Sequence, residues 1–208
     1  MKLKNRLQAI YWQTFPHYIY TVYKAYRAGV GIPVPKKLKI RTIEEYARRF
    51  ELKVFVETGT YKGDTIQATR HLFDEVHSIE LSERLASDAT LRFTHDPRIT
   101  IHQGDSGEKL SQVLSNLTRP TLFWLDAHYS AGVTARGELD SPIMQELDAI
   151  INHGVHGHMI LIDDAREFTG DNGYPTIDQL YDFVIEKMRG WRILAYNDVI
   201  RIWHPDPE

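Results

Sequence analysis

Carboxylate side chains follow two apolar runs of the chain, at the point where each run ends. Asp163 and Asp164 come directly after residues 158–162, and Asp126 comes directly after residues 122–125. Because parallel strands deliver their last residues to the same edge of a sheet, we expect the three aspartates to meet there. Oxygen ligands in a chain without cysteine favour Mg²⁺, Mn²⁺ or Ca²⁺ over zinc. The pattern predicts a divalent-metal site, against the alternative that one aspartate caps the next turn and the other is solvated.

A glycine-containing loop follows a third apolar run. Glycine lets the backbone approach a ligand closely, and the next helix offers its first N–H groups. Glu80 ends the following run, where an acid can accept both ribose hydroxyl hydrogens. Asp105 and Ser106 follow the run after that, where polar groups could bind an adenine edge. The loop alone is weak evidence, but together with these strand-end acids it predicts a nucleotide-type cofactor. The loop reads Glu57-Thr58-Gly59-Thr60-Tyr61-Lys62-Gly63.

From Leu52 onward, short apolar runs alternate with helical patterns, which is typical of a parallel sheet with crossover helices. Two further runs, 191–196 and 199–203, are separated only by Asn197 and Asp198. A connection this short joins antiparallel strands. The sequence therefore predicts an α/β fold with a mostly parallel, seven-stranded sheet and an antiparallel C-terminal hairpin. The other predicted strands are 53–57, 75–80, 99–103, 121–126 and 158–163, and the predicted helices are 64–72, 82–93, 107–117, 142–152 and 176–188.

The N-terminal segment differs in composition from the rest of the chain. Residues 1–43 hold nine lysine and arginine residues and no acidic residue, with aromatic side chains between them. We expect helices within 5–27, a linker over 29–35 and a short helix over 43–50 capped by Thr42. Residues 1–50 are thus predicted as a helical arm or cap, and 51–208 as the catalytic domain. Such an arm can cover the domain or a second copy of the chain, as in a homodimer, or make peripheral contact with an anionic membrane.

Composition excludes several classes of protein. The chain has 208 residues, a net charge of -3 and no cysteine, so it has no disulfide framework and no thiolate nucleophile. This fits a single domain in a reducing, cytoplasmic compartment. No segment approaches the ~18 consecutive apolar residues of a membrane span, and no signal peptide is visible. No nucleic-acid partner is expected, because nothing matches a recognised binding module.

At the glycine loop, Glu80 and Asp105, the chain resembles the class I S-adenosylmethionine-dependent methyltransferases, over about residues 52–203. The fold implied is a Rossmann-like three-layer sandwich whose seven-stranded sheet ends in the antiparallel hairpin. The loop is most similar to that of the metal-dependent O-methyltransferases, both the catechol O-methyltransferase-like enzymes and the antibiotic-sugar O-methyltransferases. The resemblance implies that the methionine part of S-adenosyl-L-methionine is held by Glu57, Gly59 and Gly63, with Thr58, Thr60 and Tyr61 as lining. Glu80 would hold the ribose, and Asp105 and Ser106 the adenine. Thr65 and Asp126 are further predicted cofactor contacts.

The same resemblance implies that Asp126, Asp163 and Asp164 bind Mg²⁺. In the antibiotic-sugar enzymes, Asp-Gly-Asp after the fourth strand supplies a metal ligand and then a general base. Here His128 stands in the position of the base, and Tyr129 stands where the catechol enzymes have a lysine. Imidazole has a pKa near working pH, so His128 is a candidate base, with metal ligation as the alternative. Asp126 and His128 are the predicted catalytic pair.

The expected function is an S-adenosylmethionine-dependent O-methyltransferase, assisted by a divalent metal. Polar loops over 129–140 and 167–175 favour a hydroxylated small molecule or a sugar or glycan as acceptor. Tyr129, Arg166 and Tyr174 are the predicted acceptor contacts. Two alternatives stay open. A metal-dependent hydrolase would use Asp126, His128, Asp163 and Asp164 but leaves the glycine loop without a task, and a non-catalytic module would bind the nucleoside and dock partners through the basic arm.

Overall fold

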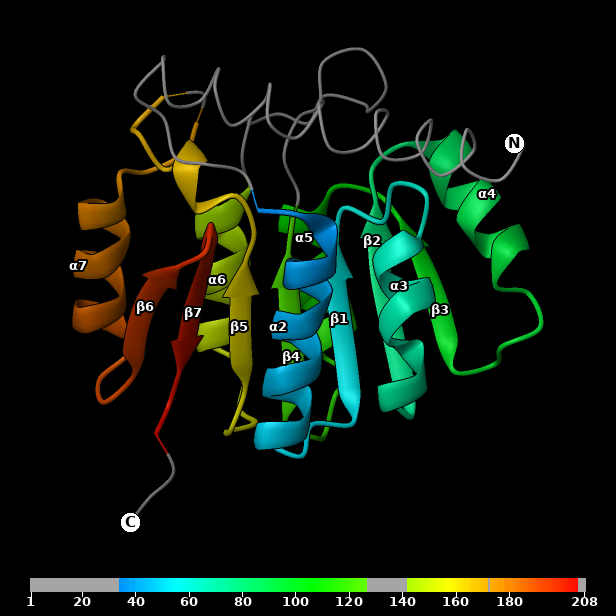
Figure 1. The fold of residues 1–208 in the computed structure, drawn as a ribbon, viewed down its shortest axis with the longest axis horizontal. Coiled ribbons are helices and arrows are strands. Elements are labelled where there is room, and N and C mark those ends of the chain that lie inside the picture. Colours follow the sequence, from blue (N-terminus) through cyan, green and yellow to red (C-terminus); the bar gives the residue numbers. More distant parts are fainter. Residues whose placement is uncertain (1–33, 127–141, 172, 206–208) are drawn as a thin grey trace, which may run out of the picture.

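A seven-stranded sheet runs through the centre of the computed structural model, which describes residues 34–126, 142–171 and 173–205 (Figure 1). The strand order is β3-β2-β1-β4-β5-β7-β6. Strands β1 to β5 are parallel, and β7 pairs antiparallel with β5 and β6. The predicted sheet and C-terminal hairpin are therefore confirmed. The strands are β1 (Val54–Thr58), β2 (Glu75–Glu80), β3 (Ile99–Gln103), β4 (Thr121–Leu125), β5 (Met159–Ile162), β6 (Arg192–Tyr196) and β7 (Val199–Trp203).

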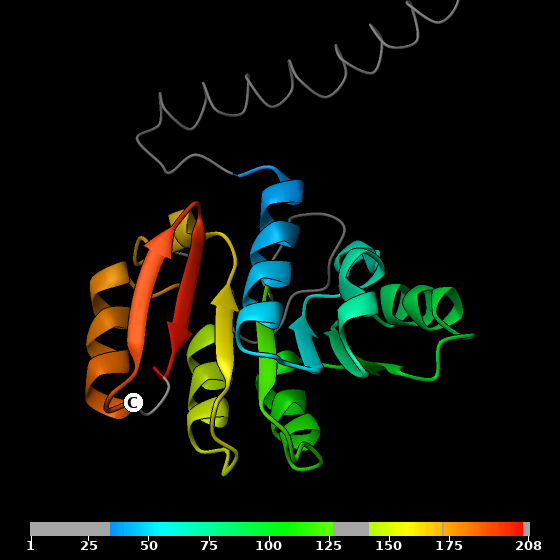
Figure 2. The same cartoon turned by 60° about the horizontal axis from the view of Figure 1, so that its bottom comes forward.

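Helices cover both faces of the sheet and make the predicted three layers (Figures 1 and 2). One core cluster joins the sheet to α5, α6 and α7, and a second joins the opposite face to α2 and α3. None of the helices in the described residues is long and apolar enough to cross a bilayer. The helices are α2 (Lys36–Arg49), α3 (Asp64–Thr69), η1 (Arg70–Leu72), α4 (Glu83–Arg92), α5 (Ser106–Leu114), α6 (Ile143–Ile151), η2 (Ala165–Glu167) and α7 (Ile177–Lys187).

Helix α2 differs from the short helix that the sequence predicts at 43–50. It begins at Lys36, and Thr42 lies inside it, where its hydroxyl donates to the Leu38 carbonyl at 3.1 Å instead of capping the helix. Ile43, Tyr46 and Ala47 recur on one face of the helix and are buried against the sheet. Figure 2 shows the helix lying lengthwise along the strands. The last part of the predicted arm or cap thus packs on the sheet, and the expected helices within 5–27 lie outside the described residues.

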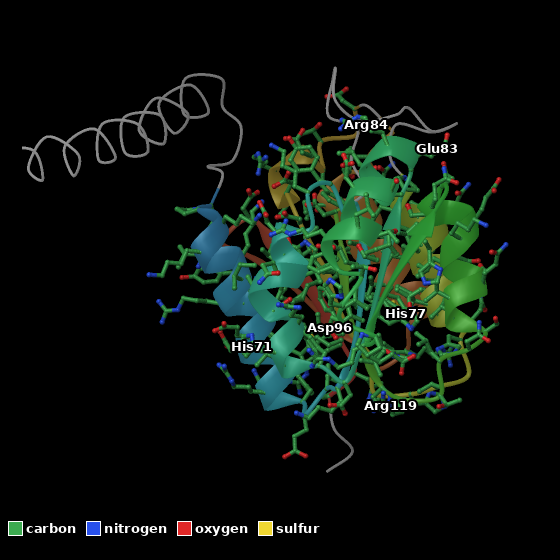
Figure 3. The ribbon with its side chains drawn as sticks, turned by 90° about the vertical axis from the view of Figure 1, so that its right-hand side faces the viewer. His71, His77, Glu83, Arg84, Asp96 and Arg119 are labelled. Carbon is green, nitrogen blue, oxygen red and sulfur yellow. The ribbon has the colours of Figure 1, made fainter. Side chains whose placement is uncertain are left out.

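The two edges of the sheet carry different side chains. Figure 3 shows Glu83 and Arg84 at the carboxyl edge and Arg119 at the opposite edge. His158 also lies at that opposite edge, where its Nδ1 accepts the Thr121 N–H at 3.1 Å. Burial lowers the pKa of His158 to about 4, which keeps the imidazole neutral as an acceptor. This histidine is therefore a structural residue, and the chemistry belongs to the carboxyl edge.

Gly63 in the glycine loop allows a test of whether a side chain at this position would strain the structure. Gly63 precedes α3 with φ of 73°, and an added Cβ would lie 2.7 Å from a ring carbon of Phe93. We expect Gly63→Ala to lower the free energy of unfolding by roughly 1–3 kcal/mol, measured by urea denaturation. In the control Gly154→Ala, an added Cβ meets nothing within 4 Å, so stability should change by less than about 1 kcal/mol. Equal stability of the two variants would contradict the strain at Gly63.

Candidate functional site

Three aspartates converge where β4 and β5 end. Asp126 follows β4, while Asp163 and Asp164 follow β5, which pairs with β4 in parallel. Each aspartate can offer one oxygen to a group of atoms that all lie within 4.8 Å of one another. This set of oxygen donors is the kind that Mg²⁺ or Mn²⁺ prefers. The geometry therefore fits a hard divalent ion, with Asp126, Asp163 and Asp164 as the residues that would hold it.

A lysine that the sequence analysis missed lies in the same cluster. Lys39 of α2 places Nζ 2.6 Å from Asp163 Oδ1 and 2.6 Å from Asp164 Oδ1. Its side chain is 16% exposed, so this is a partly buried ion pair and not a solvated charge of a basic arm. The signal was available in the sequence, because Lys39 precedes the buried Ile43 by one helical turn and so shares its face.

Arg166 was predicted to contact the acceptor, but its guanidinium group is engaged within the protein. It lies 2.7 Å from Asp164 Oδ1 and forms a second ion pair with Asp198 in the turn between β6 and β7. Its backbone N–H also donates to Asp198 Oδ1 at 3.0 Å. Arg166 therefore holds the turn after β5 against the hairpin, and its predicted acceptor contact stays a prediction.

The two adjacent aspartates titrate differently because their neighbours differ. Burial, with the charges of Asp126 and Asp164, raises the pKa of Asp163 well above its ordinary value. Burial would also raise the pKa of Asp164, but Lys39 and Arg166 outweigh it and lower that pKa to about 2. Asp164 is consequently ionised at neutral pH. A further cation nearby would stabilise the ionised form of Asp163, whose pKa is raised.

The glycine loop is tied to the ends of β1 and β2. Glu80 Oε2 accepts the Tyr61 N–H at 2.8 Å, and Oε1 accepts the Ser82 N–H at 2.9 Å. Glu57 is buried at the end of β1, where its Oε2 accepts the Ser78 hydroxyl at 2.8 Å. Burial, followed by the nearby Asp126, raises the pKa of Glu57 to about 8 against the lowering effect of Ser78. These carboxyl groups fix the conformation of the loop before any ligand arrives.

A cavity of about 230 Å³ joins the loop to the aspartates. It lies between α2 and the carboxyl ends of β1, β4 and β5. Lys39 and Trp124 reach it from α2 and β4, and neither was predicted. The glycine loop and the carboxylate cluster therefore share one cavity. Of the predicted residues, those that line it are Gly59, Thr60, Tyr61, Thr65, Asp126 and Asp163.

The predicted adenine-binding residues lie at the start of α5. Asp105 caps this helix, because its side chain accepts the Gly107 N–H at 2.8 Å. Ser106 is buried beside Glu146 of α6, a residue that the sequence analysis missed. The hydroxyls of Ser106 and Thr58 both reach the Glu146 carboxyl group, while its Oε1 has no hydrogen-bond partner in the described part of the chain. Glu146 stands among Ile143, Leu147 and Ile150 on the apolar face of α6, which was the signal for a buried acid.

Tyr174 is not among the residues that line this cavity. The Tyr174 ring packs edge-on against buried Phe168, with ring centroids 5.2 Å apart, and belongs to the core rather than the cavity lining. These packing contacts do not test its predicted acceptor contact, which stays a prediction. His128 and Tyr129 lie outside the described residues, so the general base and this acceptor contact stay predictions.

The buried acid of α6 makes folding stability depend on pH. Burial raises the pKa of Glu146 to about 7, while the Ser106 and Thr58 hydroxyls lower it. Because the folded protein binds this proton more tightly than the unfolded chain, the unfolding free energy should fall as pH rises from about 4.5 to 7. Glu146→Gln removes that loss, so it should stabilise the protein by roughly 1–3 kcal/mol more at pH 8 than at pH 5.

Urea denaturation at both pH values measures this difference. The control Glu108→Gln, at an exposed position of α5, should show the same small effect at both. A pH-independent effect of Glu146→Gln would contradict the raised pKa.

No family model and no curated protein matches the sequence. Solved structures with a similar fold are found, however. An O-methyltransferase from Bacillus cereus with bound S-adenosylhomocysteine superposes with a TM-score of 0.61 at 12% identity, covering 89% of this chain and 90% of that one. The S-adenosylhomocysteine-bound methyltransferase PaMTH1 of Podospora anserina gives 0.59 at 17% identity, with 99% and 97% covered. The O-methyltransferase TomG of Streptomyces achromogenes, in complex with S-adenosylmethionine, gives 0.60 at 12%, with 89% and 87% covered. The chain therefore has the fold of class I S-adenosylmethionine-dependent methyltransferases.

Proposed function

We propose that this protein is an S-adenosylmethionine-dependent O-methyltransferase, assisted by a divalent cation, that acts on a hydroxylated small molecule or a glycan. One observation carries the proposal: the cavity that the glycine loop lines also contains Asp126 and Asp163. Because the fold alone serves acceptors of many kinds, the reaction type rests on this neighbourhood. A nucleoside held by the loop would place its methyl group beside the carboxylate cluster.

The loop suits the sulfonium cofactor in shape and charge. Gly59 and Gly63 adopt φ values of 84° and 73°, which lets the backbone turn closely around a ligand. Thr60 and Thr65 line the cavity and are the proposed neighbours of the methionine part. Each Glu80 oxygen accepts one backbone N–H and keeps capacity for a ribose hydroxyl. Asp105 and Ser106 remain the proposed adenine contacts, with Glu146 behind them.

The chemistry is methyl transfer to an acceptor oxygen. When bound, S-adenosylmethionine supplies an electrophilic methyl group, and a divalent ion lowers the pKa of an acceptor hydroxyl. Asp126, Asp163 and Asp164 would hold that ion, and Trp124 lines one wall of the cavity. His128 is the proposed acceptor of the hydroxyl proton. Placing both reactants in one cavity supplies much of the rate gain through effective molarity.

The acceptor class is argued from the polarity of the cavity. Its lining includes Lys36, Thr60 and Asp126, which favour an acceptor with several hydroxyl groups over a flat apolar ring. Assays should compare sugars, sugar nucleotides and catechols as acceptors. Methylation of catechols alone would contradict a sugar or glycan acceptor.

The two alternatives differ in their response to the nucleoside. A metal-dependent hydrolase gives no role to the Glu80–Tyr61 contact that shapes the loop, and it should not bind S-adenosylhomocysteine. A non-catalytic module should bind the nucleoside but release no S-adenosylhomocysteine with any acceptor. Calorimetry with and without Mg²⁺, followed by a product assay, separates the three.

Location and partners remain predictions. We keep a cytoplasmic location, a homodimer, and peripheral membrane contact through residues 1–43 as proposals. Two cations of that segment are already engaged: Lys36 pairs with Asp64 at 3.3 Å, and Lys39 pairs with the carboxylate cluster. Membrane contact would therefore depend on the other cations of the segment, which include the exposed Lys37 and Arg41 of α2.

Glu80→Ala tests the cofactor site. The substitution removes the acid proposed for the ribose and the anchor of the loop, so S-adenosylhomocysteine should bind roughly 10- to 150-fold more weakly, or about 1.5–3 kcal/mol. Calorimetry measures the dissociation constant. Glu83→Ala, an exposed acid at the same edge, should leave the affinity within about twofold. Unchanged binding to the Glu80 variant would remove the ribose assignment.

Asp163→Asn tests the metal ligands. The amide keeps the shape of the side chain but loses the charge that a divalent ion needs, so turnover should fall at least about 100-fold. Binding of S-adenosylhomocysteine should remain within about threefold, because the nucleoside contacts lie on other strands. The control Asp182→Asn, at an exposed position of α7, should keep full activity. A fully active Asp163 variant would contradict metal assistance.

A further inference from the structure

The cation of Lys39 lies among the proposed metal ligands. Its ammonium group is within 2.6 Å of one oxygen of Asp163 and one of Asp164. Those two residues, with Asp126, form the group of oxygens that lie within 4.8 Å of one another. An ammonium group and a divalent ion are both compact cations, and they cannot share the same carboxylate oxygens without strong repulsion. Lys39 therefore competes for the place that a metal would take.

Packing holds Lys39 in this position. Helix α2 is anchored by buried Ile43 and Tyr46, which keep its first half over the carboxyl edge of the sheet. The flexible stem of Lys39 carries its ammonium group from this anchored backbone to the aspartates. The side chain also lines the 230 Å³ cavity, so the ammonium group has space to move into without movement of the helix.

The partners of Asp164 make such a movement inexpensive. Asp164 Oδ1 is 2.7 Å from Arg166 as well as 2.6 Å from Lys39, and Arg166 is fixed by Asp198. When Lys39 leaves, Asp164 still has a charged partner. Asp163 has Lys39 as a partner but lies beside two other carboxylates, so it is the residue that would gain most from an ion of higher charge.

We propose that Lys39 is the resident cation of the carboxylate cluster, and that a divalent ion binds there by displacing it. Lys39 then sets the metal affinity of the site. This inference rests on the metal site of the proposed function and goes beyond it, because it assigns the metal-free state a defined occupant. Metal binding should therefore change the position of the Lys39 side chain.

Binding of Mn²⁺ to the full-length, chelator-treated protein tests the proposal directly. Electron paramagnetic resonance measures the concentration of free Mn²⁺ during a titration and so gives the dissociation constant without any activity assay. Lys39→Met keeps the apolar stem and removes the charge, so it should bind Mn²⁺ at least about tenfold more tightly than the wild type. The matched control is Lys36→Met, which removes an exposed lysine of the same helix and the same cavity that pairs with Asp64. It should change the affinity by less than about threefold.

A second measurement uses the unmodified protein, so it does not depend on how a variant folds. Acylation of lysines is followed by mass spectrometry with and without Mn²⁺. Lys39 should react slowly in the metal-free protein and faster once Mn²⁺ has displaced it, while Lys36 should react equally in both. Mn²⁺ affinity that is unchanged or weaker in Lys39→Met, or Lys39 reactivity that ignores Mn²⁺, would overturn the proposal.

If neither the wild type nor Lys39→Met binds Mn²⁺, the proposal is also overturned. Retained S-adenosylhomocysteine binding would then show that only the metal part of the proposed function fails. A wild-type protein that does not bind S-adenosylhomocysteine would instead refute the methyltransferase assignment itself, whatever the results for Lys39.

Discussion

Buried carboxylates at the end of parallel strands repel one another, and this repulsion must be compensated if the strands are to stay paired. Here the compensation comes from outside the sheet. Lys39 reaches Asp163 and Asp164 from α2, and Arg166 links Asp164 to the β6–β7 hairpin. The helix at the front of the sheet and the antiparallel hairpin at its edge are thus joined through two aspartates. A pair of charges removed from water is stable only when its hydrogen-bond geometry is good. The cluster therefore constrains the positions of α2, the turn after β5 and the β6–β7 hairpin.

The cofactor side of the site is built in the same way. Glu80 holds the loop backbone at Tyr61, and Glu57 is held by Ser78 of the neighbouring strand. Thr58 Oγ1 accepts the Asp126 N–H at 3.3 Å, which connects the end of β1 to the carboxylate cluster. The loop and the cluster are therefore parts of one hydrogen-bonded edge. A ligand bound to one part would be positioned relative to the other, which is what transfer between two substrates requires.

Most of the fold could be predicted from the sequence, because the apolar runs have the length and spacing of strands and Asn197-Asp198 permits only a tight turn. The acids at strand ends could be located for the same reason. The partners of those acids could not, since they come from other elements. Lys39 was assigned to a basic arm because the start of α2 at Lys36 was not recognised. The sequence likewise does not show that Asp198 and Phe168 contact Arg166 and Tyr174, the two described residues predicted to contact the acceptor. Glu146 was overlooked because one acid on an apolar face is a small departure from an amphipathic pattern.

The central claim is that a nucleoside and a divalent ion bind side by side at the carboxyl edge of the sheet. A crystal structure of the protein with S-adenosylhomocysteine and Mn²⁺, with anomalous scattering to locate the metal, tests this most directly. We expect the nucleoside across the ends of β1, β2 and β3, and a manganese peak at coordination distance from Asp126, Asp163 and Asp164. A nucleoside bound elsewhere, or a manganese peak remote from both aspartates, would contradict it.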